Sequence, residues 1–288
     1  MPRSLDDFWS GLMLRITPQN FAAWLYDNCV GRPWSWNYGA FRAREIKRIL
    51  NNLPVSLPQQ PFGAWIDERI VEYPWMLKQL GSAKGGGQLL DAGAGLNVSQ
   101  PLSILKQQGW IVSSITLERE RFSVPGVKYY EGDLRCLPFK DCSFDAVCCL
   151  STLEHVGMDN AKYANGKAGQ PTDRSDWLLA VKEMWRVTSV GGVLRITVPC
   201  GKAADHGWFQ VFPPQLGLMI RDALRGAEVR CQYFIHQASG WIETDARSVE
   251  QCLCWDPAST ERYVTPRAAF SEGIICIEVV HSSERVDS

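Results

Sequence analysis

The chain has 288 residues, a formal net charge of −1 at pH 7 and 45% hydrophobic residues. That length fits one large domain with an extension, or two small domains, and the apolar content is ordinary for a protein with a buried core. The near-neutral charge provides no overall positive field, so we expect no binding to nucleic acid. No signal peptide is visible and no uncharged apolar stretch is long enough to span a bilayer, which predicts a cytoplasmic protein.

The ten cysteines form no Cys-x-x-Cys pair. Cys252 and Cys254 have no neighbouring histidine or second pair that would complete a zinc site. We therefore predict no metal site from this set, and free cysteines fit a reducing compartment.

The first part of the chain, residues 1–80, is predicted to be a helical cap region. Helices are expected over residues 4–14, 18–28 and 40–53. Pro74 is expected to open the second of two short helical pieces, because a proline inside a helix removes a hydrogen bond. Aromatic residues are frequent here and either form the core of the cap, make a dimer contact or enclose an acceptor molecule. They are Phe8, Trp9, Trp24, Trp34, Trp36, Tyr38 and Trp65.

Residues 81–288 show a different pattern, in which short apolar runs alternate with helical stretches after the three glycines at 85–87. Strands are expected over residues 88–91, 110–117, 127–131, 144–150, 193–198, 229–236 and 274–280. Helices are expected over residues 99–108 and 176–187, and from Pro213 to about residue 226. This alternation predicts an α/β fold, a doubly wound and mostly parallel sheet with helices on both faces.

A glycine-containing turn follows the first of these strands. Asp91 ends the strand, and Gly93 and Gly95 let the backbone pass close to a ligand at the carboxyl edge of the sheet, where such sheets bind ligands. Val98 stands where a dinucleotide site would place a third glycine, which speaks against a pyrophosphate ligand. S-adenosylmethionine needs no pyrophosphate site, and Asp91 has the right charge for its ammonium group.

The next two strands also end in polar turns. Glu118 is a candidate acceptor for the two ribose hydroxyls of an adenosyl group, with Thr116 as the alternative. Asp133 is a candidate acceptor for the adenine amino group, and Leu134 offers a backbone amide and an apolar wall. An acid after one strand is more often a cap or turn residue, so the prediction depends on three such turns at the same edge.

At this point the chain resembles class I S-adenosylmethionine-dependent methyltransferases. Asp91-Ala-Gly-Ala-Gly is similar to their first motif, and residues 131–147 are similar to their adenine-binding turn and the approach to strand four. Residues 153–156 and 186–194 resemble the signatures around strands four and five. The resemblance covers residues 85–200 and implies S-adenosylmethionine as cofactor. It also implies a Rossmann-like sheet of seven strands, the last antiparallel and formed by residues 274–280.

A narrower resemblance joins residues 67–75 and 151–158 to a subgroup associated with bacterial polysaccharide and sugar modification. It implies methyl transfer to an oxygen of a sugar, glycan or other small polar acceptor, and it places Ser151 beside the cofactor. Two departures bear on cofactor binding: Asn97 stands where many family members have a third glycine, and Glu118 is offset along its strand.

Methyl transfer from a sulfonium is an in-line displacement, so alignment of the acceptor is the main task. A base that removes a proton from an alcohol acceptor also helps, and it should follow strand four or five. His155 is the first candidate and His206 the second, although His155 and its neighbour Glu154 are equally suited to holding a loop. Asp159 also fits by position, and Asp173 and Asp205 are weaker candidates. Asp159 and Asp205 could serve a divalent metal, but the sequence shows no ligand cluster.

Two segments are expected to border the acceptor. Residues 64–80 would fold over the cofactor as a lid, and the polar loop 160–173 would select the substrate. A nicotinamide-dependent oxidoreductase is a rival interpretation, weakened by the missing glycine and by the lack of a Tyr-x-x-x-Lys pair on a predicted helix. A non-catalytic cofactor-binding or partner-stabilising protein is a second rival. The sequence leaves a homo-oligomer open.

Overall fold

The computed structural model describes residues 36–51, 57, 59–64, 66–80, 86–118, 123–164, 169–256 and 270–281. The helices expected over residues 4–14 and 18–28 lie outside these ranges, as do the side chains of the seven aromatic residues predicted for the cap. The third expected helix is present as α3, Trp36–Asn51.

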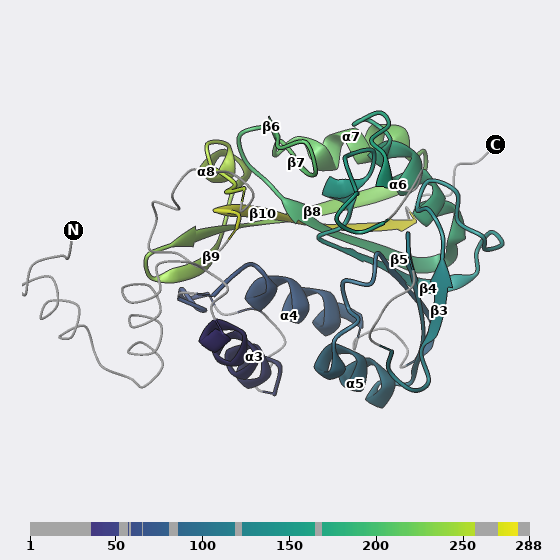
Figure 1. The fold of residues 1–288 in the computed structure, drawn as a ribbon, viewed down its shortest axis with the longest axis horizontal. Coiled ribbons are helices and arrows are strands. Elements are labelled where there is room, and N and C mark those ends of the chain that lie inside the picture. Colours follow the sequence, from purple (N-terminus) through teal and green to yellow (C-terminus); the bar gives the residue numbers. More distant parts are fainter. Residues whose placement is uncertain are drawn as a thin grey trace, which may run out of the picture.

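A single eight-stranded sheet forms the centre of the described structure, in the order β3-β2-β1-β4-β5-β10-β8-β9 (Figure 1). Strands β1 to β5 pair in parallel, whereas β10 is antiparallel to both β5 and β8. The bounds are β1 Gly87–Ala92, β2 Trp110–Thr116, β3 Lys128–Glu131, β4 Phe144–Leu150, β5 Thr188–Pro199, β8 Ala227–Gln237, β9 Gly240–Thr244 and β10 Gly273–His281. The Rossmann-like arrangement with an antiparallel last strand is therefore confirmed.

Two details of the expected sheet were wrong. The sheet has eight strands rather than seven, because β8 turns back at Gly240 (φ +115°) into the additional edge strand β9. The strand expected over residues 193–198 is part of a longer β5, which begins at Thr188 and contains a register shift opposite Phe144 and Ala146. A small separate hairpin, β6 Ala204–Asp205 with β7 Gln210–Val211, was not predicted either.

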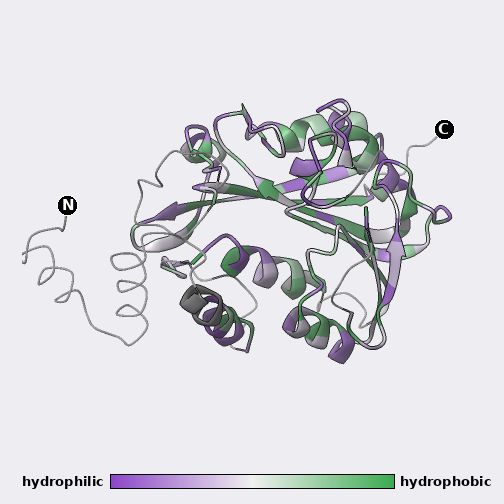
Figure 2. Cartoon of the chain, in the orientation of Figure 1, coloured by the Kyte–Doolittle hydropathy of each residue, from purple (hydrophilic) through white to green (hydrophobic). Residues whose placement is uncertain are grey.

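The helices lie on both faces of the sheet, in two separate buried clusters. Helices α3, α4 (Arg69–Leu80) and α5 (Ser99–Gln107) lie on one face (Figure 1). Helices α6 (Trp177–Val187) and α7 (Leu216–Ala223) lie on the other. Figure 2 shows that these helices carry both hydrophobic and hydrophilic residues, as expected when one side packs on a sheet and the other meets solvent. The short helices η2 (Leu153–His155) and α8 (Ala246–Val249) follow β4 and β9.

Helix α4 is continuous, so the expected division at Pro74 was wrong. Proline deletes one backbone donor, and the remainder of the helix is held by burial of its apolar side chains. Ile70, Val71, Met76 and Leu77 are fully buried. Helix α4 is thus a packed wall of the fold beside the carboxyl edge of the sheet.

The proposed division at residue 80 remains a prediction. Residues of α3 and α4 share one buried cluster with residues of β1, β2 and β4, so this part of the chain has no separate core among the described residues. Within the described part of the chain, no helix is both long and apolar enough to cross a membrane.

Candidate functional site

A cavity of about 840 Å³ opens at the carboxyl edge of the sheet. The turns after β1, β2, β3 and β4 contribute one group of lining residues, called the strand side below, and α4 with the segment after η2 contributes the other, called the helix side. From the strand ends come Gly93, Ala94, Gly95, Val98, Thr116, Leu117, Glu118, Gly132, Asp133, Leu134, Arg135, Leu150, Ser151 and Thr152. From the other side come Arg69, Tyr73, His155, Val156, Gly157, Asn160, Ala161, Lys162, Tyr163, Ala164, Gln170 and Thr172.

Both predicted glycines of the first turn lie in the cavity wall, and the structure adds a reason for them. Gly93 has φ +99°, and a Cβ there would collide with the side chain of Thr152. A Cβ on Gly95 would lie 2.6 Å from the carbonyl oxygen of Leu150. The turn after β1 therefore packs tightly against the end of β4, which brings these two parts of the wall together.

Asp91 is placed behind this turn and is absent from the described residues that line the cavity. Its fully buried carboxylate accepts hydrogen bonds from the backbone amide of Leu96, at 3.1 Å, and from the hydroxyl of Ser114, at 3.3 Å. These contacts make Asp91 an anchor of the glycine turn. The predicted contact with a ligand's ammonium group stays a prediction.

The departure at Asn97 does not disturb the cavity wall. The side-chain oxygen of Asn97 accepts a hydrogen bond from the hydroxyl of Tyr129 at 2.8 Å, and Tyr129 in turn accepts one from the backbone amide of Val124. Val98, at the position of a third dinucleotide-type glycine, lines the cavity instead.

Both ribose candidates lie in the cavity wall. Thr116 ends β2, and the hydroxyl of Thr116 donates to the backbone carbonyl of Glu118, so the two residues form one compact turn. The turn brings Glu118 to the cavity although it follows the strand by two residues. The two candidates remain alternatives.

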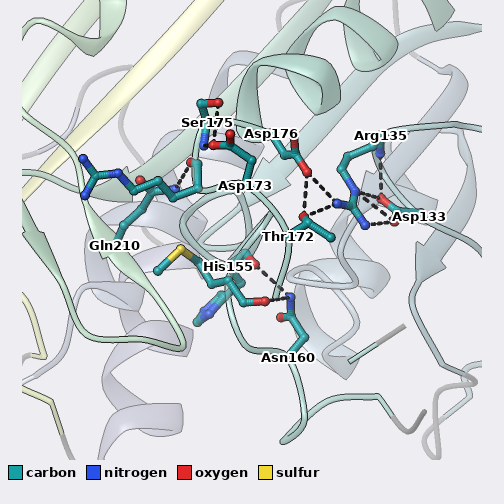
Figure 3. A network of polar contacts seen from close by, with 11 residues as sticks. Asp133, Arg135, His155, Asn160, Thr172, Asp173, Ser175, Asp176 and Gln210 are labelled. Carbon is teal, nitrogen blue, oxygen red and sulfur yellow. Dashed lines mark hydrogen bonds and ion pairs between the residues drawn. The ribbon is translucent and has the colours of Figure 1, made fainter. Parts of the chain in front are cut away.

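Asp133 and Leu134 follow β3 and line the cavity next to an ion-pair network (Figure 3). Arg135 donates to both carboxylate oxygens of Asp133, at 2.6 Å and 3.0 Å, and also to Asp176 at 2.7 Å. Partial burial raises the pKa of Asp133, but the hydrogen bonds from Arg135 outweigh it and hold that pKa below its usual value. Asp133 is thus an ionised acceptor at neutral pH, with a side chain 35% exposed.

Ser151 lies directly after β4 with φ +41°, an uncommon conformation for a residue with a side chain. Its hydroxyl donates to Glu72 at 2.6 Å, and its backbone amide donates to the carbonyl of Thr197 at 2.9 Å. Ser151 lines the cavity as predicted, and its side chain is held by a residue that the sequence analysis did not identify.

Glu72 of α4 is that residue. Its carboxylate is fully buried and accepts hydrogen bonds from Ser151, from Thr197 at 2.7 Å and from Arg69. Because Thr197 belongs to β5, Glu72 joins α4 to the ends of two strands. It also holds the guanidinium of Arg69, which lines the cavity together with Tyr73.

His155 lies in the cavity wall, as predicted for the first base candidate. Its Nδ1 lies 2.8 Å from the carbonyl oxygen of Trp208, so Nδ1 carries the proton and donates. Among the described residues Nε2 has no hydrogen-bond partner. Burial lowers the pKa of His155 to about 4, which keeps the imidazole neutral at pH 7.

The aspartates and the second histidine that were candidates lie elsewhere. His206 stacks on Phe209, with ring centroids 4.4 Å apart, and is absent from the described cavity lining. Asp159, Asp173 and Asp205 accept hydrogen bonds from backbone amides two residues further along the chain, at Ala161, Ser175 and Gly207. In the described part of the chain no group of three potential metal ligands occurs.

Two buried carboxyl groups near the cavity are mostly protonated at neutral pH. Burial raises the pKa of Glu154, beside His155, to about 8, and it raises that of Glu68 on the turn before α4 to about 8. Oε2 of Glu154 has no hydrogen-bond partner among the described residues. Neither residue lines the cavity in the described part of the chain.

The loop after η2 supplies much of the second side of the cavity. The side-chain amide of Asn160 donates to the carbonyls of His155, at 2.9 Å, and Met158, at 3.0 Å, which fixes the start of the loop (Figure 3). Residues 160–164, Gln170 and Thr172 then line the cavity. This position is the one that was expected for the loop 160–173.

Comparison with known proteins agrees with this geometry. Residues 90–196 match the family described as "Methyltransferase domain". The YcgJ protein from Bacillus subtilis is 14% identical, with a TM-score of 0.50 over 74% of this chain and 99% of that one. A SAM-dependent methyltransferase from Archaeoglobus fulgidus is 14% identical, with a TM-score of 0.45 over 73% and 92% of the two chains.

A third structure is the 1,6-didemethyltoxoflavin-N1-methyltransferase of Burkholderia thailandensis, solved with its substrate and S-adenosylhomocysteine. It is 14% identical, with a TM-score of 0.45 over 93% of this chain and 92% of that one. The comparison with curated proteins gave no match. At 14% identity the YcgJ structure, with its TM-score of 0.50, shows a shared fold alone. The matched segment contains the strand-end turns that line the cavity. The chain therefore contains a segment with the sequence pattern of a methyltransferase domain, carried on a Rossmann-like fold.

Proposed function

We propose that the protein is an S-adenosylmethionine-dependent methyltransferase that methylates an oxygen of a small polar acceptor, a sugar or glycan hydroxyl. The observation that carries the proposal is the meeting of three turns in one cavity. Gly93 and Gly95, Glu118, and Asp133 with Leu134 come from consecutive strands and face the same space. An adenosyl group needs that combination of a close backbone turn, a ribose acceptor and an adenine acceptor.

The charges of this side of the cavity fit the cofactor. Glu118 or Thr116 would accept from the ribose hydroxyls, Asp133 would accept from the adenine amino group, and Leu134 would pack against the ring. Ser151 and the glycine turn would border the methionine part. S-adenosylmethionine has a net positive charge, so the ionised Asp133 and the carboxylate of Glu118 favour it electrostatically.

The bound cofactor would supply an activated methyl group on a positively charged sulfur. The protein's own task is to hold the acceptor oxygen in line with that methyl carbon and to take up the hydroxyl proton. His155 is the proposed proton acceptor, because its Nδ1–H donates to Trp208 and leaves the Nε2 lone pair available. The low pKa of about 4 keeps that lone pair unprotonated at neutral pH. The hydroxyl becomes acidic enough to lose its proton only as the new carbon–oxygen bond forms.

Helix α4 would form the wall over the cofactor, in the place where a lid was expected. Arg69 and Tyr73 line the cavity from this helix. Its apolar residues are part of the core, so we propose a fixed wall and expect deletion through Leu80 to unfold the protein.

Calorimetry with S-adenosylmethionine, S-adenosylhomocysteine and NAD tests the proposal. We expect saturable binding of the first two and none of NAD, because Val98 stands where a pyrophosphate needs a glycine. Binding of NAD alone would favour the oxidoreductase alternative. Absence of binding by all three would favour a non-catalytic protein with this fold.

We also propose a cytoplasmic location. The support is the set of cysteines, since no disulfide bond joins the cysteines of the described part of the chain, as is usual in a reducing compartment. Membership of the sugar-modifying subgroup and self-association stay predictions from the sequence.

A further inference from the structure

The charged side chains of the cavity are divided between its two sides. The acidic groups that line it, Glu118 and Asp133, both lie at strand ends. Among the described lining residues of that side the cation is Arg135, and Asp133 and Asp176 neutralise it. On the opposite side the described lining contains the cations Arg69 and Lys162 and no acid.

Lys162 carries an uncompensated charge. Its ammonium group lies 3.8 Å from the centre of the Trp208 ring. An aromatic face stabilises a cation without neutralising it. In the described part of the chain no carboxylate lies within ion-pair distance of Lys162, so its full charge remains available at the cavity.

Arg69 adds hydrogen-bond donors on the same side. It is paired with Glu72, whose carboxylate is shared with Ser151 and Thr197. A planar guanidinium has five N–H donors, so pairing with one carboxylate leaves other donors available. Arg69 is therefore fixed in place with donors left for a ligand.

Asp67, which also acts on Arg69, is itself paired with Arg42. The other titratable groups around the helix side do not cancel the charge of Lys162. His155 is neutral at pH 7 because burial lowers its pKa to about 4. The hydroxyl of Tyr163 is protonated, since burial raises its pKa to about 12. Glu68 and Glu154 lie behind the wall, and their pKa values of about 8 keep them mostly protonated at pH 7.

From this division of charge we infer that the acceptor is an anionic small molecule. Its carboxylate or phosphate would lie at Lys162 and Arg69, and the hydroxyl to be methylated would lie at Nε2 of His155. Tyr163, 50% exposed and 5.1 Å from His155 between ring centres, offers a face for a sugar or aromatic ring. This inference rests on the proposed function, because it assigns the acidic side of the cavity to the cofactor.

The test uses the full-length protein saturated with S-adenosylhomocysteine and three matched probes: D-glucose 6-phosphate, D-glucuronate and D-glucose. Calorimetry gives the dissociation constant of each without requiring turnover. We expect at least one anionic probe to bind about tenfold or more tightly than glucose, as one charge-assisted hydrogen bond would give. The comparison of the two anions shows whether phosphate or carboxylate is preferred.

A lysine variant links this preference to the cavity. Lys162→Gln should weaken binding of the preferred anion about fivefold, the upper end for an exposed ion pair, and leave glucose unchanged. Lys202→Gln is the matched control, since Lys202 is also exposed and lies outside the described cavity lining. An equal effect of both variants would assign the preference to general surface charge and overturn the inference.

The failure of this inference differs from a failure of the proposed function. If S-adenosylhomocysteine does not bind, the cofactor assignment falls and the acceptor inference falls with it. If S-adenosylhomocysteine binds but neither anion is preferred to glucose, including when no probe binds, the methyltransferase proposal stands and the anionic acceptor is ruled out.

Discussion

The two sides of the cavity are held together by different kinds of contact. On the strand side, Asp133 is 35% exposed and its main partner, Arg135, is two residues away. On the helix side, Glu72 is fully buried, and two of its partners, Ser151 and Thr197, are 79 and 125 residues away. The strand side is therefore held by contacts between neighbouring residues and is open to a ligand. On the helix side the contacts join segments that lie far apart in the sequence.

This contrast predicts where a substitution should affect stability and where it should affect binding. A buried charge that loses its partner remains in a medium of low dielectric constant, so the free energy of unfolding decreases. Water can solvate a partly exposed carboxylate when its partner is removed, so such a substitution weakens ligand binding more than it destabilises the fold. The predictions below separate these two outcomes.

The largest effect is expected for Glu72→Gln. The variant leaves the guanidinium of Arg69 without its carboxylate and disturbs the hydrogen bonds from Ser151 and Thr197. Breaking a buried ion pair costs about 3–5 kcal/mol, and urea unfolding would measure that loss. Asp141→Asn is the control, because Asp141 is 75% exposed in its pair with Arg186 and should cost at most about 1 kcal/mol. Equal losses in the two variants would contradict the role given to Glu72.

His155→Gln should reduce turnover by about a hundredfold or more, the usual contribution of a positioned base. The dissociation constant of S-adenosylhomocysteine should stay unchanged, because His155 lies on the acceptor side. Single-turnover kinetics with an acceptor that the unmodified protein methylates would measure the first effect, and calorimetry would measure the second. His206→Gln is the matched control, since that ring stacks on Phe209 away from the described cavity lining, and it should leave turnover intact. Undiminished turnover in His155→Gln would leave the histidine only its role in holding the loop.

Asp133→Ala should weaken S-adenosylhomocysteine binding by about tenfold to a hundredfold, as expected for the loss of one hydrogen bond to a charged group. Calorimetry at a fixed salt concentration measures it. Asp176→Asn separates this effect from the release of Arg135, because Asp176 also binds that arginine but does not line the cavity among the described residues. If Asp176→Asn weakens binding as much as Asp133→Ala does, the position of Arg135 matters and the carboxylate of Asp133 does not.

The same contrast explains what could be predicted from the sequence. The strand-side residues follow their strands in continuous motifs, so Gly93, Gly95, Glu118, Asp133 and Leu134 were all found by reading strand ends. The bounds of β4 were also predicted correctly, because an apolar run between turn residues is a local signal.

The helix side left no comparable signal in the sequence. Glu72 and Arg69 are one turn apart on α4, and such pairs are common on exposed helices. Only the pairing of β4 with β5 brings Ser151 and Thr197 next to each other beneath that helix. The hairpin of β6 and β7 was not predicted either, because its strands are only two residues long, and it holds His206 outside the described cavity lining.

The smallest effect is a change in the pH dependence of the free energy of unfolding. It tests whether the carboxyl group of Glu154 is uncharged in the folded protein. Burial raises its pKa to about 8 from a usual value of 4.5. A raised folded-state pKa gives stability that is complete below pH 4.5 and is lost as the pH rises through 8. His155 works in the opposite sense but only between pH 6.5 and about 4, where its pKa is depressed, so it does not interfere above pH 6.5.

Between pH 6.5 and 8, the free energy of unfolding of the unmodified protein should therefore fall as pH rises, with Glu68 and Glu154 both contributing. In Glu154→Gln the slope should be less steep by about 1.4 kcal/mol per pH unit, the value for one proton. Urea titrations at half-unit steps would measure it, and the slope does not depend on how much the new amide itself destabilises the core. Identical slopes would mean that Glu154 is ionised throughout this pH range. Its negative charge would then lie close to the helix-side residues of the cavity and would offset the charge of Lys162.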